Sequence, residues 1–264
     1  MGVRKTNIKT KPMKKDERTG RSAGRCISAP RMLKSAAVNA MLAAIALGLF
    51  LALGRRGGVA AKASAAPLGA IRLASDSAVY RGKKGGNASL LIAVSWDASA
   101  LPSILERLEE RGAKATFALS GSFVRENGAL VKLIAERGHE LALMAEQDAE
   151  NRSAEELKAE LERTSALIEG ASGVKPRTVF AGGSDKLCRA ANALGQTAVK
   201  GSIDLVCERG TASELILRAK GNISGGDIVV CAPTAAFSVA VSDILEYFCS
   251  AGLTAATVSG TIYD

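Results

Sequence analysis

Three carboxylates stand where apolar sequence gives way to polar sequence, and they are the first candidates for chemistry. Asp97 follows the apolar run 89–95, and Glu146 and Asp148 follow the run 140–144. If these runs are parallel strands, their carboxyl ends meet at one edge of a sheet, where α/β proteins place functional groups. The three carboxylates could then form an oxygen-only cation site. The alternative is that they lie in solvated loops.

Trp96 and His139 are the only tryptophan and the only histidine of the chain. Trp96 is either a core residue or a sugar-stacking platform, and His139 is either a packed turn residue at the start of a strand or a ligand. A single histidine excludes sites that need several imidazoles. The segment 182–185, Gly-Gly-Ser-Asp, is either an anion site at a helix N-terminus or a plain helix cap.

Composition and charge narrow the class of protein. The 264 residues are 47% hydrophobic, which excludes wholesale disorder, and only 4% aromatic, which argues against a stacking platform for single-stranded nucleic acid. The net charge is +9, and residues 1–34 hold 11 basic and 2 acidic residues. The rest of the chain holds the other 24 of 35 basic and 24 of 26 acidic residues, so its charges balance. The basic character belongs to the tail, so we expect no nucleic-acid partner.

Residues 35–54 contain no charged side chain and are long enough to span a bilayer as a helix. The excess of basic residues before this run predicts a cytoplasmic N-terminus and an extracytoplasmic domain in a single-pass protein of the cell membrane. The expected organisation is a basic cytoplasmic tail (1–34), a transmembrane anchor (35–54), a flexible juxtamembrane spacer (55–86) and a folded domain (87–264). A cleaved secretory signal, with a site near residues 63–65, is the alternative.

From residue 87 onward, apolar runs alternate with amphipathic stretches. Strands are expected at 89–95, 115–119, 140–144, 178–180, 197–203, 228–231 and 255–258. Helices are expected at 101–111 and 124–137 and from near Ser153, Asp185, Thr211 and Ala235. This alternation predicts an α/β fold with a mainly parallel sheet, either a (β/α) barrel or a flavodoxin-like open sheet.

Two separated blocks of the sequence carry motifs of a known family. The first contains Lys-Ala-Thr-Phe at 114–117, Gly121 and Gly-His-Glu-Leu at 138–141, and the second contains Gly-Asp-Ile-Val-Val at 226–230 and Thr-Val-Ser at 257–259. Both blocks resemble the polysaccharide deacetylases of NodB homology, in particular the sporulation-type members. The resemblance implies a distorted (β/α) barrel that hydrolyses acetyl groups of cell-wall or extracellular glycans. It also implies a divalent metal held by one Asp and two His, with a second Asp as base and another His as acid.

The positions that carry this chemistry in the family depart from its pattern. In one alignment Asp97 matches the base, and in the other Ala93 replaces it; in both, Ala98 replaces an Asp. Met144 and Asp148 stand where the family has its two histidine ligands. Ala181 stands in place of the Arg that orients the base, and Ala232 stands in place of the acid His. The degenerate family positions are therefore Ala98, Met144, Asp148, Ala181 and Ala232. Thioether and methyl groups do not build a water-activating metal site.

The sequence therefore leads to three hypotheses of different classes. The first is a membrane-anchored, catalytically degenerate deacetylase-like protein without a cofactor, which binds a cell-wall glycan or an envelope protein in peptidoglycan or spore processes. The second is an active deacetylase with zinc in a rearranged site of Asp97, Glu146 and Asp148. The third is a structural membrane protein without a ligand. Under the first hypothesis Asp97 is a relic base, and Trp96, Glu146 and Asp148 contact the ligand.

The cysteines form no CxxC pattern, which argues against a zinc or thioredoxin-type motif. Beyond the expected anchor they are Cys188, Cys207, Cys231 and Cys249. They are either paired in disulfides or buried as small hydrophobic residues. The second alternative is expected for Cys231, which lies inside an apolar run.

Overall fold

The structure, a computed structural model, describes residues 77–146, 149–206 and 210–263. All described residues belong to one compact unit, residues 69–264. The basic tail, the apolar run 35–54, Asp148, Cys26 and Cys207 lie outside the described residues. Within the described ranges, no helix combines the length and apolarity that a membrane crossing requires.

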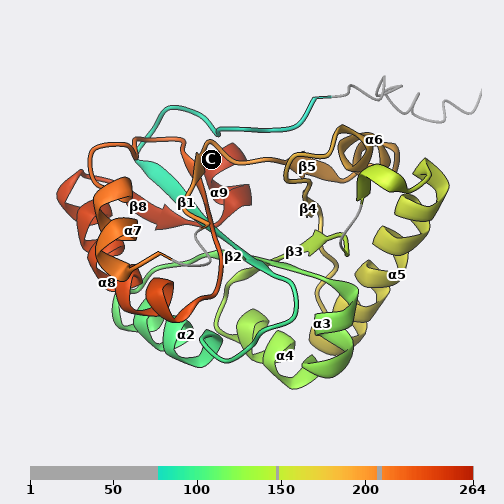
Figure 1. Cartoon of the computed structure of the whole chain (residues 1–264), viewed down its shortest axis with the longest axis horizontal. Coiled ribbons are helices and arrows are strands. Elements are labelled where there is room, and N and C mark those ends of the chain that lie inside the picture. Colours follow the sequence, from blue (N-terminus) through green and yellow to red (C-terminus); the bar gives the residue numbers. More distant parts are fainter. Residues whose placement is uncertain (1–76, 147–148, 207–209, 264) are drawn as a thin grey trace, which may run out of the picture. The chain divides into compact units, whose positions relative to one another are not determined.

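One curled sheet organises the described domain, and every pairing between its named strands is parallel (Figure 1). Its strands are β1 (Asn87–Val94), β2 (Thr116–Leu119), β3 (Glu140–Met144), β4 (Thr178–Phe180), β5 (Thr197–Val199), β6 (Ile203–Asp204), β7 (Ile228–Cys231) and β8 (Thr254–Ala256). Their order is β5-β4-β3-β2-β1-β7-β6, with β8 paired to β1. The α/β class and the parallel sheet predicted from sequence are confirmed.

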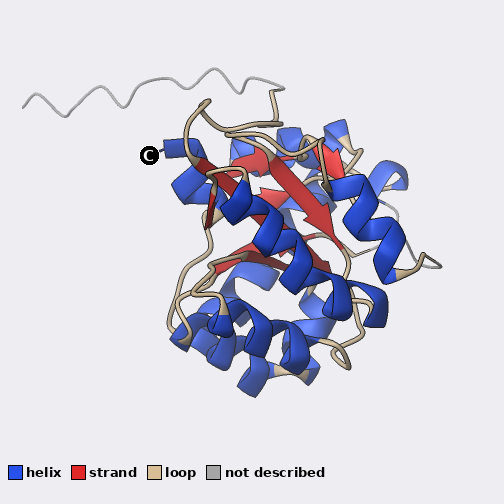
Figure 2. Cartoon of the chain, turned by 90° about the vertical axis from the view of Figure 1, so that its left-hand side faces the viewer, coloured by secondary structure: helices blue, strands red, loops and turns tan. Residues whose placement is uncertain are grey.

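Helices cover the outside of the curled sheet (Figure 2), except the last one, α9, which packs against the inner apolar cluster. They are α2 (Leu101–Glu110), α3 (Gly121–Glu126), α4 (Gly128–Glu136), α5 (Ala154–Ser172), α6 (Asp185–Ala193), α7 (Ala212–Ala219), α8 (Ala235–Ser250) and α9 (Val258–Tyr263), with a short 3-10 helix at Ala149–Asn151. The predicted capping boxes are present at α5 and α7, where Ser153 and Thr211 each accept a hydrogen bond from the backbone three residues on.

Two apolar clusters cover the two faces of the curled sheet. The larger cluster joins the outer face of the sheet to the helices and includes Leu90, Ile92, Phe117 and Phe237. A smaller cluster fills the inside of the curl with side chains of the opposite parity, such as Leu91. Because neighbouring residues of a strand point to opposite faces, a strand that is covered on both sides reads as a continuous apolar run.

The curl brings the two edge strands together through a very short connection. Residues 200–202 lead directly from β5 at one edge to β6 at the other. Gly201 makes this turn with φ of 84°, and a Cβ there would lie 2.4 Å from a methyl of Val230. The backbone of Val79, in the segment expected as spacer, also forms hydrogen bonds with Ala198 of β5 and with Lys200, which directly follows β5.

Three predicted elements are wrong in their extent. The helix expected over 124–137 is divided at Asn127 into α3 and α4, since Asn127 leaves helical geometry and ends one helix while starting the next. The strand expected over 197–203 is divided into β5 and β6 by the turn at Gly201. The last strand ends at Ala256, and Val258 begins α9 instead.

The amino ends of the strands are closed by α9 and one carboxylate. Glu140 accepts hydrogen bonds from the hydroxyls of Thr116 and Thr178, both at 2.8 Å. It also accepts from the backbone N–H of Ser259 at 2.9 Å and from the Ser259 hydroxyl at 2.7 Å. A single side chain at the start of β3 therefore ties β2, β4 and α9 together.

Cys188, Cys231 and Cys249 are free thiols in the structure. Cys188 and Cys231 are fully buried, which confirms the expectation for Cys231, whereas Cys249 is exposed. Burial raises the pKa of the Cys231 thiol well above its usual range. Cys231 is therefore a packing residue of β7.

Candidate functional site

A pocket opens at the carboxyl ends of β1, β2 and β3, and we call it the carboxyl-end pocket. Its volume is about 430 Å³. Its lining includes Ser95, Trp96, Ser120, Ser122, Met144 and Glu146. Three of these residues, Trp96, Met144 and Glu146, were candidates or family positions in the sequence. The structure therefore brings the segments after β1 and β3 to one site, as parallel strands should.

Trp96 lies at the outer part of this pocket. Its side chain is 73% exposed, so its interpretation as a core residue is wrong. The indole follows β1 directly, where the strand ends at Val94 and the chain turns toward α2. An exposed aromatic face beside a polar pocket is a suitable surface for stacking against a flat ligand.

Asp97 and Ala98 lie between Trp96 and α2. The Asp97 side chain is exposed, and its Oδ1 accepts the backbone N–H of Ser99 at 2.8 Å. This hydrogen bond lowers the pKa of the Asp97 carboxyl below its ordinary value. Ala98 packs partly buried against the larger core cluster. Asp97 is thus a turn-forming carboxylate outside the residues that line the pocket.

Sequence reasoning missed the serines that build the polar wall. The Ser120 hydroxyl donates to the carbonyl of Ser95 at 2.6 Å and lies 3.0 Å from the Ser122 hydroxyl. Ser120 also caps α3 by accepting the N–H of Phe123. The available signal was the Ser-Gly-Ser segment directly after the predicted strand 115–119. It marks a helix start at a strand's carboxyl end, where side chains are well placed to meet a ligand.

Glu146 is the best-anchored carboxylate of the site. Its two oxygens accept the backbone N–H of Ser122 at 2.7 Å and the Ser122 hydroxyl at 3.0 Å. Its own N–H donates to the carboxylate of Glu160 at 2.6 Å, and Glu160 in turn pairs with Arg152. Contacts with α3 and α5 therefore fix Glu146, and it is no freely solvated loop residue.

The remaining family positions lie at the carboxyl ends of other strands. Ala181 follows β4 and is buried, and Ala232 follows β7. Met144 ends β3 and packs with Ala93 against the inner cluster, so these two side chains face the inside of the curl. The structure thus places Ala93 and Met144 on β1 and β3, and Ala181 and Ala232 directly after β4 and β7, while Asp148 lies outside the described residues.

The divalent metal that the sequence resemblance implies does not fit the described donors. At the carboxyl-end pocket they are serine hydroxyls, a thioether and the Glu146 carboxylate, whose oxygens already accept hydrogen bonds from Ser122. Across residues 77–146, 149–206 and 210–263, no three His, Cys, Asp or Glu side chains are grouped closely enough to hold a metal ion. Catalytic zinc sites use imidazole and carboxylate ligands.

His139 and the 182–185 segment have structural roles in the fold. His139 Nδ1 accepts the backbone N–H of Ala115 at 3.3 Å, and its ring meets Phe117 edge-on at 5.3 Å. Burial, then the charges of Lys114 and Arg137, lower its pKa from 6.5 to about 4. In the 182–185 segment, Ser184 caps α6 by accepting the N–H of Leu187. Both structural interpretations are confirmed.

Comparisons with known proteins agree with the fold. A profile of the family described as polysaccharide deacetylase matches residues 86–199. The uncharacterized protein YlxY of Bacillus subtilis is 35% identical over 91 residues, which are 34% of this chain and 28% of YlxY. The chain therefore spans little more than a quarter of that relative.

Two solved structures share the architecture. BA3943 from Bacillus anthracis, described as a CE4 family pseudoenzyme, is 25% identical with a TM-score of 0.66, covering 71% of this chain and 69% of its own. The Bc1960 peptidoglycan N-acetylglucosamine deacetylase is 18% identical with a TM-score of 0.65, covering 69% and 91%. The match over residues 86–199 and this shared curled sheet show that the described domain is similar to the polysaccharide deacetylases and shares their fold.

Proposed function

We propose that this protein is a catalytically degenerate deacetylase that binds an acetylated cell-envelope glycan at the carboxyl-end pocket without hydrolysing it. One observation carries the proposal. The pocket combines the exposed Trp96 indole and a polar wall of serines with Met144, a thioether, at a family metal-ligand position. The likeness to a protein described as a pseudoenzyme supports it.

The lining of the pocket suits a sugar ring. A flat apolar sugar face can stack on Trp96, while sugar hydroxyls and acetamido groups need polar partners at the edges. The Ser120 and Ser122 hydroxyls can donate or accept, and Glu146 accepts only. A ligand of this chemistry uses every polar group of the wall.

Hydrolysis of an acetyl group requires an activated water and a proton donor for the leaving group, and the described site supplies neither. The only histidine of the chain, His139, directly precedes β3, whereas the pocket lies at the opposite end of that strand. Five strand residues separate the two ends by roughly 16 Å. The imidazole is therefore at the wrong end of the fold for acid or base work in this pocket.

The proposal includes the cellular setting. The uncharged run 35–54 after a basic tail supports a single membrane anchor with the domain outside the cytoplasm. An anchored domain of this kind would meet envelope glycan, or a protein bound to it, close to the membrane surface. The family match and the Bc1960 likeness support a glycan as the ligand.

The single tryptophan gives a direct test in the full-length chain in detergent. Titration with N-acetylchitotetraose should change the intrinsic tryptophan fluorescence, because all of that signal comes from Trp96. Trp96→Ala should weaken binding about tenfold or more by calorimetry, since truncating an aromatic anchor costs ~2 kcal/mol. Leu217→Ala, a change at an equally exposed residue on α7, is the control and should bind as the wild type does.

Two results would contradict the proposed glycan binding without hydrolysis. Unchanged fluorescence together with unchanged affinity of Trp96→Ala would exclude a glycan at this pocket. Acetate release that depends on added zinc and is lost in Asp97→Asn would instead support the rearranged carboxylate site of Asp97, Glu146 and Asp148.

A further inference from the structure

The amino ends of the strands carry an excess of basic residues. The segments concerned are the one before β1 and those that lead from a helix into a strand, and we call the surface that they form the amino-end face. Because all pairings between the named strands are parallel, these segments meet at one end of the sheet. Among the described residues they hold nine basic residues and a single acidic one, Asp227.

Most of these basic residues have no acidic partner. Arg81, Arg111 and Arg137 form ion pairs, with nitrogen–oxygen distances of 2.6, 3.4 and 3.2 Å. The other six are exposed and form no ion pair within the part of the chain that the structure describes: Lys83, Lys84, Lys114, Lys175, Arg177 and Lys220. The amino-end face therefore carries six uncompensated positive charges.

Helix stability accounts for only part of this excess. A basic side chain is favourable in the last turn of a helix, where it meets the negative end of the helix dipole, and the effect fades beyond that turn. Of the six unpaired residues, Lys220 is such a cap, at the end of α7. Lys175 and Arg177 lie beyond the end of α5 at Ser172, and Lys84 precedes a strand. Their charges serve no helix end and are available to a partner.

The opposite end of the sheet shows no such excess. The segments that follow strands contain three acidic and two basic residues within the described ranges. Both basic residues are paired, Arg152 with Glu160 and Lys200 with Asp185. The charge of the domain is therefore asymmetric, with its uncompensated cations at the amino ends.

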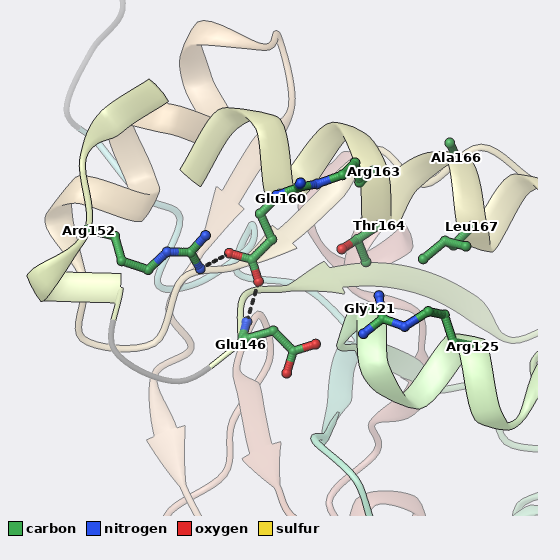
Figure 3. A pocket seen from close by; sticks show the side chains of 9 residues that line it. All are labelled: Gly121, Arg125, Glu146, Arg152, Glu160, Arg163, Thr164, Ala166 and Leu167. Atoms are coloured by element: carbon green, nitrogen blue, oxygen red, sulfur yellow. Dashed lines mark hydrogen bonds and ion pairs between the residues drawn. The ribbon is translucent and has the colours of Figure 1, made fainter. Parts of the chain in front are cut away.

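The arginines nearest the carboxyl ends confirm this contrast. A pocket of about 600 Å³ lies between α3 and α5, and we call it the α3–α5 pocket (Figure 3). Arg125, Arg152 and Arg163 line it together with Glu146 and Glu160. The basic residues of this pocket thus lie among carboxylates, which those of the amino-end face do not.

Two large exposed side chains lie among the charges of the amino-end face. Val174, directly before Lys175, is 47% exposed, and Tyr263, at the end of α9, is 60% exposed. Tyr263 also lines a cavity of about 670 Å³ together with Lys175 and Arg177. Tyrosine is enriched at membrane–water interfaces, and a surface that combines basic and apolar side chains is typical of proteins that lie on anionic lipid.

The segment 77–86, through which the chain enters the described domain, is fixed to this face. The N–H of Gly82 donates to the carbonyl of Gly226 at 2.8 Å, and Nζ of Lys83 donates to the carbonyl of Tyr263 at 2.9 Å. Both partners lie at the amino ends, one just before β7 and the other at the end of α9. The chain that precedes the domain is therefore joined to it at the basic face.

The proposed membrane anchor, residues 35–54, is close in sequence to this entry. Residues 55–76 separate the two, and a chain of that length spans at most about 75 Å when fully extended. A domain anchored in this way stays near the lipid surface. The face that the connecting chain enters is then within reach of the headgroups.

We propose that the amino-end face docks on the anionic surface of a phospholipid bilayer, which turns the carboxyl-end pocket away from the membrane. Anionic headgroups attract each basic side chain that comes within about a Debye length of them. A bilayer suits the face better than a soluble polyanion does, because Val174 and Tyr263 gain contact with the interface. The inference rests on the proposed function for the anchor that brings the two surfaces together.

The test is amine footprinting of the full-length chain in two kinds of vesicle, phosphatidylcholine alone and phosphatidylcholine with about one quarter phosphatidylglycerol. A water-soluble reagent acetylates exposed amines, and mass spectrometry gives the rate at each lysine. In the anionic vesicles Lys84, Lys175 and Lys220 should react about fivefold or more slowly than in the neutral ones, because anionic lipid attracts each of them. Lys132 of α4 and Lys158 of α5, outside the face, are internal controls and should react equally in both.

Salt and substitution separate docking from mere proximity to the bilayer. Sodium chloride at about 0.5 M should remove the difference, because it shortens the Debye length to roughly 4 Å. Lys175→Gln/Arg177→Gln should restore most of the reactivity of Lys84 in anionic vesicles, whereas the matched Lys132→Gln/Arg189→Gln should not. All four replaced residues are exposed, so both variants should fold, and circular dichroism checks this.

Equal rates in the two kinds of vesicle would overturn the inference and leave the proposed anchor and glycan binding standing. Failure of the chain to float with neutral vesicles would contradict the anchor, and flotation with anionic vesicles alone would then still support docking through the basic face. Flotation with neither would overturn both. Protection of the same lysines by duplex DNA, but not by anionic vesicles, would assign the face to a nucleic acid and so overturn the inference.

Discussion

At the scale of single residues, function depends on which end of a strand a side chain occupies. His139 precedes β3 and Met144 is its last residue, yet the imidazole is buried at the amino end and the thioether lines the carboxyl-end pocket. The sequence supplies one histidine, and the fold uses it for packing against Phe117. The only imidazole of the chain therefore lies at the end of β3 opposite the carboxyl-end pocket.

The burial of His139 has a measurable consequence for stability. Its pKa is lowered from 6.5 to about 4, so between these values the unfolded chain takes up a proton that the folded domain does not. The free energy of unfolding should fall as the pH is lowered through this window, by at most about 3 kcal/mol from this residue. Above pH 6.5 both states hold the neutral imidazole, and this contribution is fully retained.

Because the chain contains one histidine, NMR follows this titration without assignment. The imidazole signal should titrate near pH 4, and His139→Gln should remove its part of the pH dependence seen in urea unfolding between about pH 6.5 and 4. A titration midpoint near 6.5 would contradict the buried, neutral imidazole.

At the scale of elements, one end of the sheet is open and the other is closed. The carboxyl ends of β1, β2 and β3 open into the carboxyl-end pocket, and the amino ends are closed by α9 through Glu140. A closed amino end leaves the carboxyl ends free to differ in sequence. Residues at the carboxyl ends can therefore change without removing the Glu140 contacts that join the amino ends.

Glu140→Ala should destabilise the domain on the order of 3 kcal/mol, because four donors on three elements lose their acceptor. The measurement is urea unfolding followed by circular dichroism. Glu136→Ala, which removes an exposed carboxylate paired only with Lys132 on α4, should change stability by less than about 0.5 kcal/mol. Equal effects of the two substitutions would show that the Glu140 network carries no special stability.

At the scale of the whole molecule, periodicity and capping predicted most elements, because these signals are local. The capping boxes at Ser153 and Thr211 mark helix starts within a few residues, and apolar runs mark strands. The division at Asn127 was missed because the apolar pattern continues through it. Local pattern also does not show how far a sheet curls, which depends on contacts such as the close approach of Gly201 to Val230.

The sequence predicted only those residues of the candidate site that directly follow predicted strands. Trp96 and Glu146 follow predicted strands, so their meeting at one pocket could be expected from the parallel sheet. Arg125 and Arg163 come from two helices on either side of β3, and no spacing signal links them. Both residues line one pocket because α3 packs against α5.

The central claim, binding without hydrolysis, is tested most directly by mass spectrometry of glycan recovered from the immobilised full-length chain. After prolonged incubation with N-acetylated oligosaccharide and zinc, we expect the bound glycan to be recovered with every acetyl group in place. Recovery of a glycan lighter by one or more acetyl groups would show catalysis, and recovery of none would show that the pocket does not bind it. Either result would contradict the account.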